Sequence, residues 1–199
     1  GTVTGVQTCA LPICSVPGVG RVGVVGLGVG GALAPEVANS DARVAFVVLL
    51  STPALSGEEL DLSRLRGMLS RSKADRALTD HELRVTQEID DVLRVAPSDA
   101  AALRSGADIM IANGRAPDDA RGAMRSLSRT DHRAALAYDP LPALSALRVP
   151  TLVISGANDT AVLVADNQPI FHRALTGHPR TRIVVLDGDN HWLQIGRAH

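Results

Sequence analysis

The stretch LRVPTLVISGANDTAVLVADNQ, residues 147–168, decides the fold that we predict, together with RIVVLDGDNHWL at 182–193. Each contains a nearly continuous run of Val, Ile and Leu, the pattern of a parallel strand covered on both faces. The first run is followed by Gly-x-x-Asp, which ends on Asp159, and the second by Gly-x-x-His, which ends on His191. Because parallel strands end at one edge of a sheet, both side chains are expected at the same rim.

Two similar runs lie nearer the N-terminus, RVGVVG at 21–26 and RVAFVVLL at 43–50. Short helical stretches at 31–39 and 160–176 separate the members of each pair of runs. Strand, helix and strand at this spacing indicate βαβ units with right-handed crossovers. The sequence therefore predicts an α/β fold in which all four runs are adjacent parallel strands of one sheet.

Residues 56–147 differ in character from the predicted strands. This stretch is rich in Arg, Asp, Glu, Ala and Leu at helical spacing, and Ser98 and Asp118 are candidate N-caps. We predict a helical insertion at 56–147, between sheet segments at 14–55 and 148–193.

Both ends of the chain resemble translated sequencing adaptors. The resemblance lies in VTGVQTCALPI at 3–13 and QIGRAH at 194–199, so residues 1–13 and 194–199 are left out of the fold prediction. Cys9 and Cys14 lie in or beside the first segment and therefore predict neither a disulfide nor a metal site. The remaining stretch is expected to be cut from a longer gene at both ends, without its true N-terminus.

The glycine-rich turn after the first run has two interpretations. Gly26, Gly28 and Gly31 fit G-x-G-x-x-G between a strand and a helix, as in dinucleotide-binding Rossmann domains. That motif also expects an acidic residue at the end of the next strand, where this chain has VVLLST. The second interpretation is G-x-S-x-G, the nucleophile elbow, which residues 26–30 fit except that Gly28 replaces the serine. The turn alone leaves both open, together with a turn that binds nothing.

With this turn, the two downstream motifs resemble those of α/β hydrolases of the serine aminopeptidase-like or dienelactone-hydrolase-like esterase kind. In such proteins P-x-L-x-x-x-G-x-x-D carries the acid of the catalytic triad and L-x-G-x-x-H carries the histidine. YDPLPALSALRVP at 138–150 also resembles the stretch that leads from the lid to the acid strand. The resemblance does not extend over the helical insertion. It implies a partial α/β-hydrolase fold, a parallel sheet flanked by helices, with 56–147 as a helical lid.

The resemblance assigns the site positions in the chain order of this fold. Gly28 stands at the nucleophile position, Asp159 at the acid and His191 at the histidine. The backbone N–H of Val29, directly after the nucleophile position, would supply one oxyanion-hole donor. Other polar residues near these motifs are interpreted as solvated or structural, namely Asp166, Asp187, Asp189, His172, His178, Ser51 and Ser155.

The implied reaction is hydrolysis of a small-molecule ester, or of an amide, through a Ser-His-Asp acyl-enzyme that needs no cofactor and no metal. Gly28 lacks the nucleophile and has two explanations. In the first explanation the glycine is genuine and the chain is a non-catalytic binding protein. In the second the glycine reflects a one-base difference from a serine codon in a raw sequence. An NAD(P)-binding Rossmann domain is a third possibility.

Composition excludes several other classes of function. A net charge of −1 without a basic block gives no reason to expect nucleic-acid or membrane partners. No apolar run approaches the roughly 18 residues of a membrane span, and the apolar segment near the N-terminus lacks the basic flank of a signal peptide. We therefore expect a cytoplasmic location. The oligomeric state is not predicted.

Overall fold

The computed structural model describes residues 16–178 and 180–195. Of the two segments interpreted as adaptor sequence, all of 1–13 and residues 196–199 of 194–199 lie outside the described residues, as do Cys9 and Cys14. The adaptor interpretation therefore stays a prediction.

A four-stranded sheet forms the centre of the first part of the structure. Its strands run in the order β1-β2-β3-β4, and every neighbouring pair is parallel. The register aligns Leu27 with Leu50 and Leu50 with Ile154, so the first three strands end at the same edge. This confirms the prediction of four adjacent parallel strands: β1 (Val22–Leu27), β2 (Val44–Leu50), β3 (Thr151–Gly156) and β4 (Thr181–Leu186).

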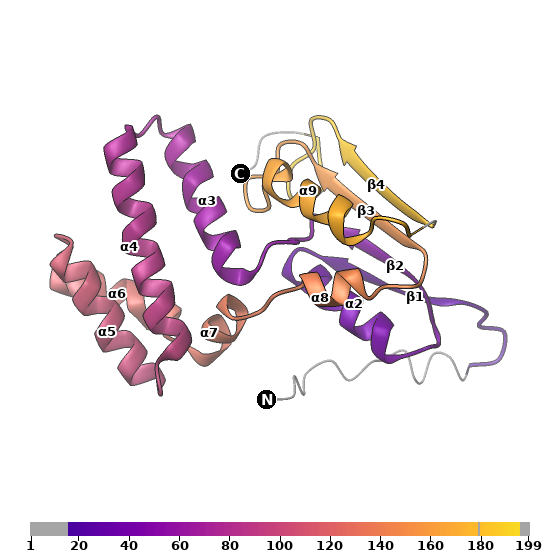
Figure 1. Cartoon of the computed structure of the whole chain (residues 1–199), viewed down its shortest axis with the longest axis horizontal. Coiled ribbons are helices and arrows are strands. Elements are labelled where there is room, and N and C mark those ends of the chain that lie inside the picture. Colours follow the sequence, from indigo (N-terminus) through magenta and orange to yellow (C-terminus); the bar gives the residue numbers. More distant parts are fainter. Residues whose placement is uncertain (1–15, 179, 196–199) are drawn as a thin grey trace. The chain divides into compact units, whose positions relative to one another are not determined.

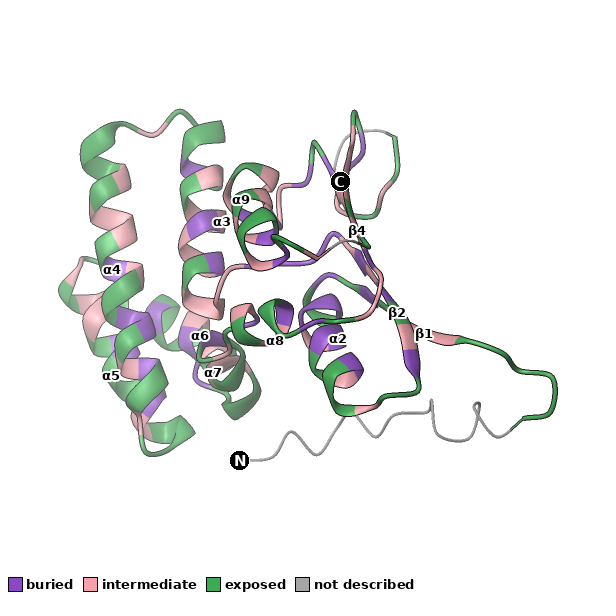
Figure 2. Ribbon diagram, turned by 45° about the vertical axis from the view of Figure 1, so that its right-hand side comes forward, coloured by how far each residue is buried: buried purple, intermediate pink, exposed green. Residues whose placement is uncertain are grey.

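Three helices cover one face of this sheet: α2 (Val29–Ser40), α8 (Leu141–Ser145) and α9 (Val164–Ala174) (Figure 1). The strand order explains this, because right-handed crossovers that advance in one direction place their helices on the same face. Figure 2 shows the buried positions along α2 and the strands behind it. The core between helices and sheet consists of Ala34, Ala38, Val44, Val47, Leu49, Ala54, Leu144, Leu147, Val153, Phe171 and Leu175.

The chain divides into two compact units. One contains the sheet and comprises Gly1–Leu55 with Pro140–His199, and the other is Ser56–Asp139. The helical unit therefore ends at Asp139, whereas the sequence placed the end of the insertion at 147. The difference arises because Leu144 and Leu147 are fully buried in the core of the sheet unit.

The helical unit contains α3 (Gly57–Arg71), α4 (Arg76–Val95), α5 (Asp99–Ala112), α6 (Pro117–Leu127) and α7 (Thr130–Leu136). Ser56 caps α3 through a capping box with Glu59, and Ser98 caps α5 as expected. Asp118 is not an N-cap, because Pro117 already occupies the first turn and the cap position falls on Ala116. The apolar core of this unit consists of Val85, Ile89, Leu93, Ala102, Ala107, Ala120, Met124 and Leu136.

One acidic side chain is buried in the helical unit. Asp90 in α4 is only 5% exposed, and its Oδ2 atom has no hydrogen-bond partner among the described residues. Burial and, to a lesser extent, the nearby carboxylates of Asp61 and Glu58 raise the pKa of Asp90 to about 7. The group therefore changes charge near neutral pH.

Candidate active site

The turn between β1 and α2 has the backbone of a sharp elbow. Gly28 lies between the last strand residue, Leu27, and the first helical residue, Val29, with φ 54° and ψ −132°. Its N–H donates to the carbonyl of Leu50 at 2.9 Å, and its carbonyl accepts from the N–H of Gly31 at 2.9 Å. A positive φ favours glycine, because other residues adopt it only under strain.

Packing accounts for two of the other glycines of this turn. A Cβ at Gly26 would collide with the backbone of Gly31, and a Cβ at Gly31 would collide with the side chain of Thr52. These two positions let strand and helix cross closely, which needs no bound phosphate. Packing does not explain Gly30, a flanking glycine of the elbow motif, because a Cβ there would meet no atom of the described residues within 4 Å beyond its chain neighbours and the nearby backbone of its own helix.

Asp159 is held in a tight turn just after β3. Its N–H donates to the carbonyl of Gly156 at 3.1 Å, and its side chain is only 1% exposed. Oδ1 accepts the N–H groups of Ala161 and Val162, both at 2.8 Å. Two backbone donors on one carboxylate oxygen fix the carboxylate plane and leave Oδ2 available to another partner.

The loop after β4 packs against the loop after β3. The N–H of Asn158 donates to the carbonyl of Asp189 at 2.8 Å, and a Cβ on Gly156 would collide with the Asp189 and Asn190 carbonyls. Asp189 is therefore buried, and its interpretation as a solvated turn residue is wrong. Asn190 is also buried, and its Oδ1 accepts from the N–H of Trp192 at 2.9 Å.

The role of Asn190 was not predicted from the sequence. Its signal was an asparagine directly before a candidate histidine, in a turn where Asn side chains commonly bond the backbone ahead. A second bond, from the N–H of Gln194 at 3.2 Å, adds to this role. Asn190 thus folds the segment that carries His191.

These loops bring the three sequence-predicted positions together. Nδ1 of His191 lies 2.8 Å from Oδ2 of Asp159. On the other side of the ring, a Cβ added at Gly28 would lie 3.3 Å from Nε2 of His191. Donation of the Nδ1 proton to the carboxylate leaves Nε2 as an acceptor that faces position 28.

Val29 is the first residue of α2 and is 54% exposed. Its N–H is among the first four of the helix, which have no intrahelical acceptor, so it has the direction that an anion donor needs.

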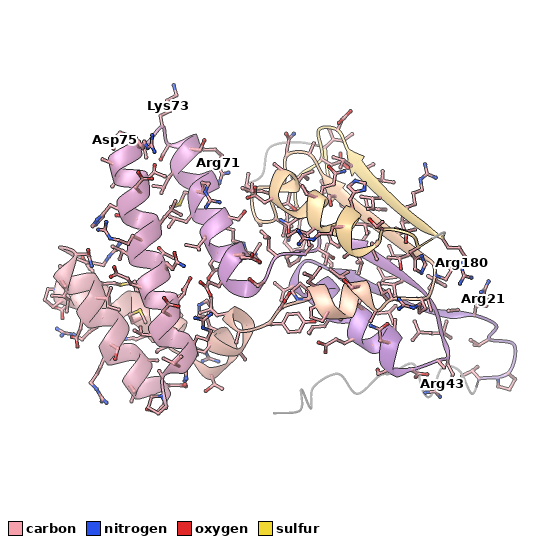
Figure 3. All side chains as sticks on the ribbon, viewed as in Figure 1. Arg21, Arg43, Arg71, Lys73, Asp75 and Arg180 are labelled. Atoms are coloured by element: carbon pink, nitrogen blue, oxygen red, sulfur yellow. The ribbon has the colours of Figure 1, made fainter. Side chains whose placement is uncertain are left out.

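The remaining candidates stay outside this arrangement. Nδ1 of His178 is hydrogen-bonded to the hydroxyl of Thr181 at 3.0 Å. Thr181 begins β4, so this pair lies at the amino ends of the strands, opposite to their carboxyl ends. Arg21, Arg43 and Arg180 precede three of the strands and mark that amino-terminal edge in Figure 3.

Ser51 is the unexpected residue at the carboxyl edge. It directly follows β2 with φ 44°, a value that L residues rarely adopt. It is fully buried, and its hydroxyl has no hydrogen-bond partner among the described residues. A run of valines and leucines followed by Ser and Thr carries no signal for this strained backbone.

The described residues contain neither a metal-binding cluster nor a membrane-spanning helix. In the described ranges, no group of three or more His, Cys, Asp or Glu side chains is placed to hold a metal ion. None of the helices there combines the length and the apolar composition needed to cross a bilayer.

The sequence matches the model of the alpha/beta hydrolase family over residues 2–199. The chain belongs to the α/β hydrolase family. Membership decides against the dinucleotide-binding interpretation of the glycine turn, and the sheet is a partial α/β-hydrolase fold. No curated protein sequence matches this α/β hydrolase.

Solved structures similar to this α/β hydrolase include esterases and serine hydrolases. An esterase of Pyrococcus furiosus has 18% identity and a TM-score of 0.45, covering 86% of this chain and 46% of that one. A serine hydrolase of Cycloclasticus zankles has 17% identity and a TM-score of 0.44, covering 94% and 62%. Est1E of Butyrivibrio proteoclasticus has 12% identity and a TM-score of 0.45, covering 93% and 59%. The chain thus spans about half to three fifths of the length of these proteins.

Proposed function

We propose that this α/β hydrolase belongs to a lineage that hydrolyses a small carboxylic ester, or an amide, at Gly28, Asp159 and His191. The observation that carries the proposal is the hydrogen bond between His191 and Asp159 on the ring side opposite to position 28. A histidine held in this way is arranged to take a proton from a nucleophile at that position.

Each group has a role in this reaction. With serine at position 28, His191 removes the hydroxyl proton while the oxygen attacks the carbonyl carbon, and the buried Asp159 stabilises the imidazolium that forms. The N–H of Val29 donates to the developing oxyanion. His191 then gives its proton to the leaving alcohol, and water releases the acid from the acyl-enzyme by the same two transfers. The reaction needs no cofactor or metal.

The helical unit Ser56–Asp139 is proposed as the lid of this enzyme. It is inserted between β2 and β3, and both strands end at the edge that carries the site. Residues that follow the carboxyl ends of parallel strands commonly form the walls of a binding site. In this proposal the lid selects the acyl and alcohol groups of the substrate.

A second candidate function rests on Gly28 itself. The elbow keeps its positive φ, and the Asp159–His191 bond forms without any side chain at position 28. A non-catalytic protein that binds an ester or a carboxylate at the same edge would have this combination.

The direct test restores the nucleophile. We expect Gly28→Ser to hydrolyse a short-chain aryl ester, measured by release of the phenol. Adding His191→Ala should reduce this activity by several powers of ten, because triad members act as a unit. His178→Ala in the same background is the matched control and should leave the activity unchanged, since that ring lies at the opposite edge.

Two results would separate the candidates. A Gly28→Ser chain with an unchanged circular dichroism spectrum and no turnover contradicts the hydrolase proposal. If that inert chain still binds the aryl ester, with binding lost in His191→Ala, the non-catalytic function is supported instead.

A further inference from the structure

We propose that the chain with Gly28 hydrolyses its ester by direct attack of water, without an acyl-enzyme, using a water molecule placed between position 28 and His191 as the nucleophile. This inference rests on the proposed function, because it uses the same site and substrate class. It differs in mechanism, since no covalent acyl-enzyme forms and no side chain attacks.

The first support is the space in front of the histidine ring. Among the described residues other than its two chain neighbours, a Cβ at Gly28 would contact only the ring of His191 within 4 Å, Nε2 at 3.3 Å and Cε1 at 3.7 Å. A serine oxygen would lie one bond beyond that Cβ. A water oxygen in the place of this hydroxymethyl group is therefore within hydrogen-bond reach of Nε2, about 2.6–3.2 Å. The His191 side chain is 22% exposed, so solvent reaches the ring.

The second support is that the base is complete without residue 28. Asp159 is oriented by the backbone N–H groups of Ala161 and Val162 and by the ring of His191. None of these bonds involves the elbow. A glycine at position 28 therefore removes the nucleophile but leaves an oriented imidazole whose Nε2 accepts a proton.

The third support is the choice of glycine rather than alanine. Gly28 has φ 54°, so any other residue there strains the backbone. Glycine relieves this strain and also leaves the space of the side chain to solvent. An alanine methyl would occupy that space without supplying an attacking atom.

The chemistry balances with water as the only co-reactant. The water oxygen forms a bond to the ester carbonyl carbon while its proton passes to Nε2 of His191, and the carbonyl oxygen becomes an oxyanion that accepts the N–H of Val29. The bond from that carbon to the alcohol oxygen then breaks, and the Nε2 proton passes to the departing alcohol. The products are one carboxylic acid and one alcohol, and the ring returns to its starting state.

The experiment compares the unaltered chain with Gly28→Ala, His191→Ala and Gly28→Ser on the same short-chain aryl ester. His191→Ala should reduce turnover about 10²–10⁴-fold, the usual contribution of a general base. Gly28→Ala should reduce it at least tenfold, because the methyl displaces the water. Gly28→Ser imposes the same backbone strain, so its activity controls for misfolding.

A second readout distinguishes the mechanisms. The unaltered chain should show no burst of phenol and no labelling by an alkyl fluorophosphonate, whereas Gly28→Ser should show both, since only serine forms a covalent intermediate. If Gly28→Ala does not fold, the unaltered chain is compared with His191→Gln instead. Glutamine fills part of the space of the imidazole ring but cannot act as the base.

Failure of this inference looks different from failure of the proposed function. The water mechanism is overturned, and the proposed function stands, if Gly28→Ser is active while the unaltered chain is inert. The same conclusion follows if Gly28→Ser is active and the unaltered chain is no more active than His191→Ala. Turnover by Gly28→Ala equal to that of the unaltered chain also overturns the water mechanism. If neither the unaltered chain nor Gly28→Ser turns over ester, the proposed function itself fails.

Discussion

Oδ1 of Asn167 accepts a hydrogen bond from the backbone N–H of Ala54 at 2.8 Å, although the residues lie 113 positions apart. The same oxygen is 3.3 Å from the N–H of Leu55, and Nδ2 donates to the carbonyl of Leu163 at 2.9 Å. Asn167 is only 2% exposed. One buried amide thus joins α9 to the segment that follows β2, where the sheet unit ends and the helical unit begins.

This bond predicts a measurable cost. Asn167→Ala leaves the buried N–H of Ala54 without its acceptor, and we expect the free energy of unfolding to fall by about 1–3 kcal/mol in a urea titration. The matched control is Gln168→Ala at the next helical position, which should change stability by less than about 0.5 kcal/mol. Equal losses in the two variants would show that the Asn167 bond contributes nothing specific.

Asp90 predicts a dependence of stability on pH. Its pKa in the folded chain is raised to about 7 from the ordinary value of 3.8. Between these two pH values the folded state therefore keeps a proton that the unfolded state has already released. The favourable contribution of Asp90 to the free energy of unfolding is therefore complete below pH 3.8, declines as the pH rises toward about 7, and is absent above that pH. Asp61, Glu58 and Asp91 repel its charge, and Arg94 attracts it.

Asp90→Asn removes this charge while keeping the shape of the side chain. We expect the variant to be more stable than the unaltered chain at pH 8, by roughly 2 kcal/mol after allowance for solvent screening, and equally stable at pH 4. Thermal unfolding at both pH values measures the difference. Asp108→Asn serves as the control, because Asp108 is exposed in α5 and is not among the charged groups that shift the pKa of Asp90. A pH-independent effect of Asp90→Asn would rule out the titration of Asp90 as its cause.

The sheet predicts poor solubility of this chain when it is produced alone. In the described residues β1 pairs only with β2, and Val25, Leu27 and Phe46 of these two strands are 62%, 42% and 38% exposed. An open strand edge beside exposed apolar side chains favours association.

We expect Val25→Lys to reduce this association, because a charge on the edge strand opposes further strand pairing. Val95→Lys in α4 is the matched control, since Val95 is 75% exposed and lies outside the sheet. Light scattering of the two variants measures the effect. A monodisperse unaltered chain that unfolds cooperatively would contradict the prediction.

The strands were predictable because a run of apolar side chains is enough to indicate a buried strand, without knowledge of distant contacts. A buried parallel strand needs an almost unbroken apolar run, and the runs at 21–26 and 43–50 became β1 and β2 within one residue of those bounds. The positions of Asp159 and His191 followed from the strand ends. Helix limits were less readable, since α2 already begins at Val29 and α8 owes its place to Leu144 in the core.

What the sequence could not predict depends on contacts between distant segments. Asn167 is an ordinary helical residue until the loop after β2 lies beside it. Asp189 reads as a turn residue until its carbonyl meets Asn158. Ser51 gives no sign in the sequence of its positive φ, and its N–H donates to the carbonyl of Ile154 in a distant strand at 2.8 Å.

The division of the site between the two βαβ units has a consequence for how this protein can evolve. The bond between Asp159 and His191, with the loops that hold it, lies wholly within one continuous segment from β3 to the loop after β4. Position 28 belongs to the other unit, β1–α2–β2. Recombination at 55/56 and 139/140 would exchange the helical unit without separating acid from base. Under the proposed function, a lineage can therefore change the residue at position 28, or acquire a new helical unit, while inheriting the Asp159–His191 pair intact.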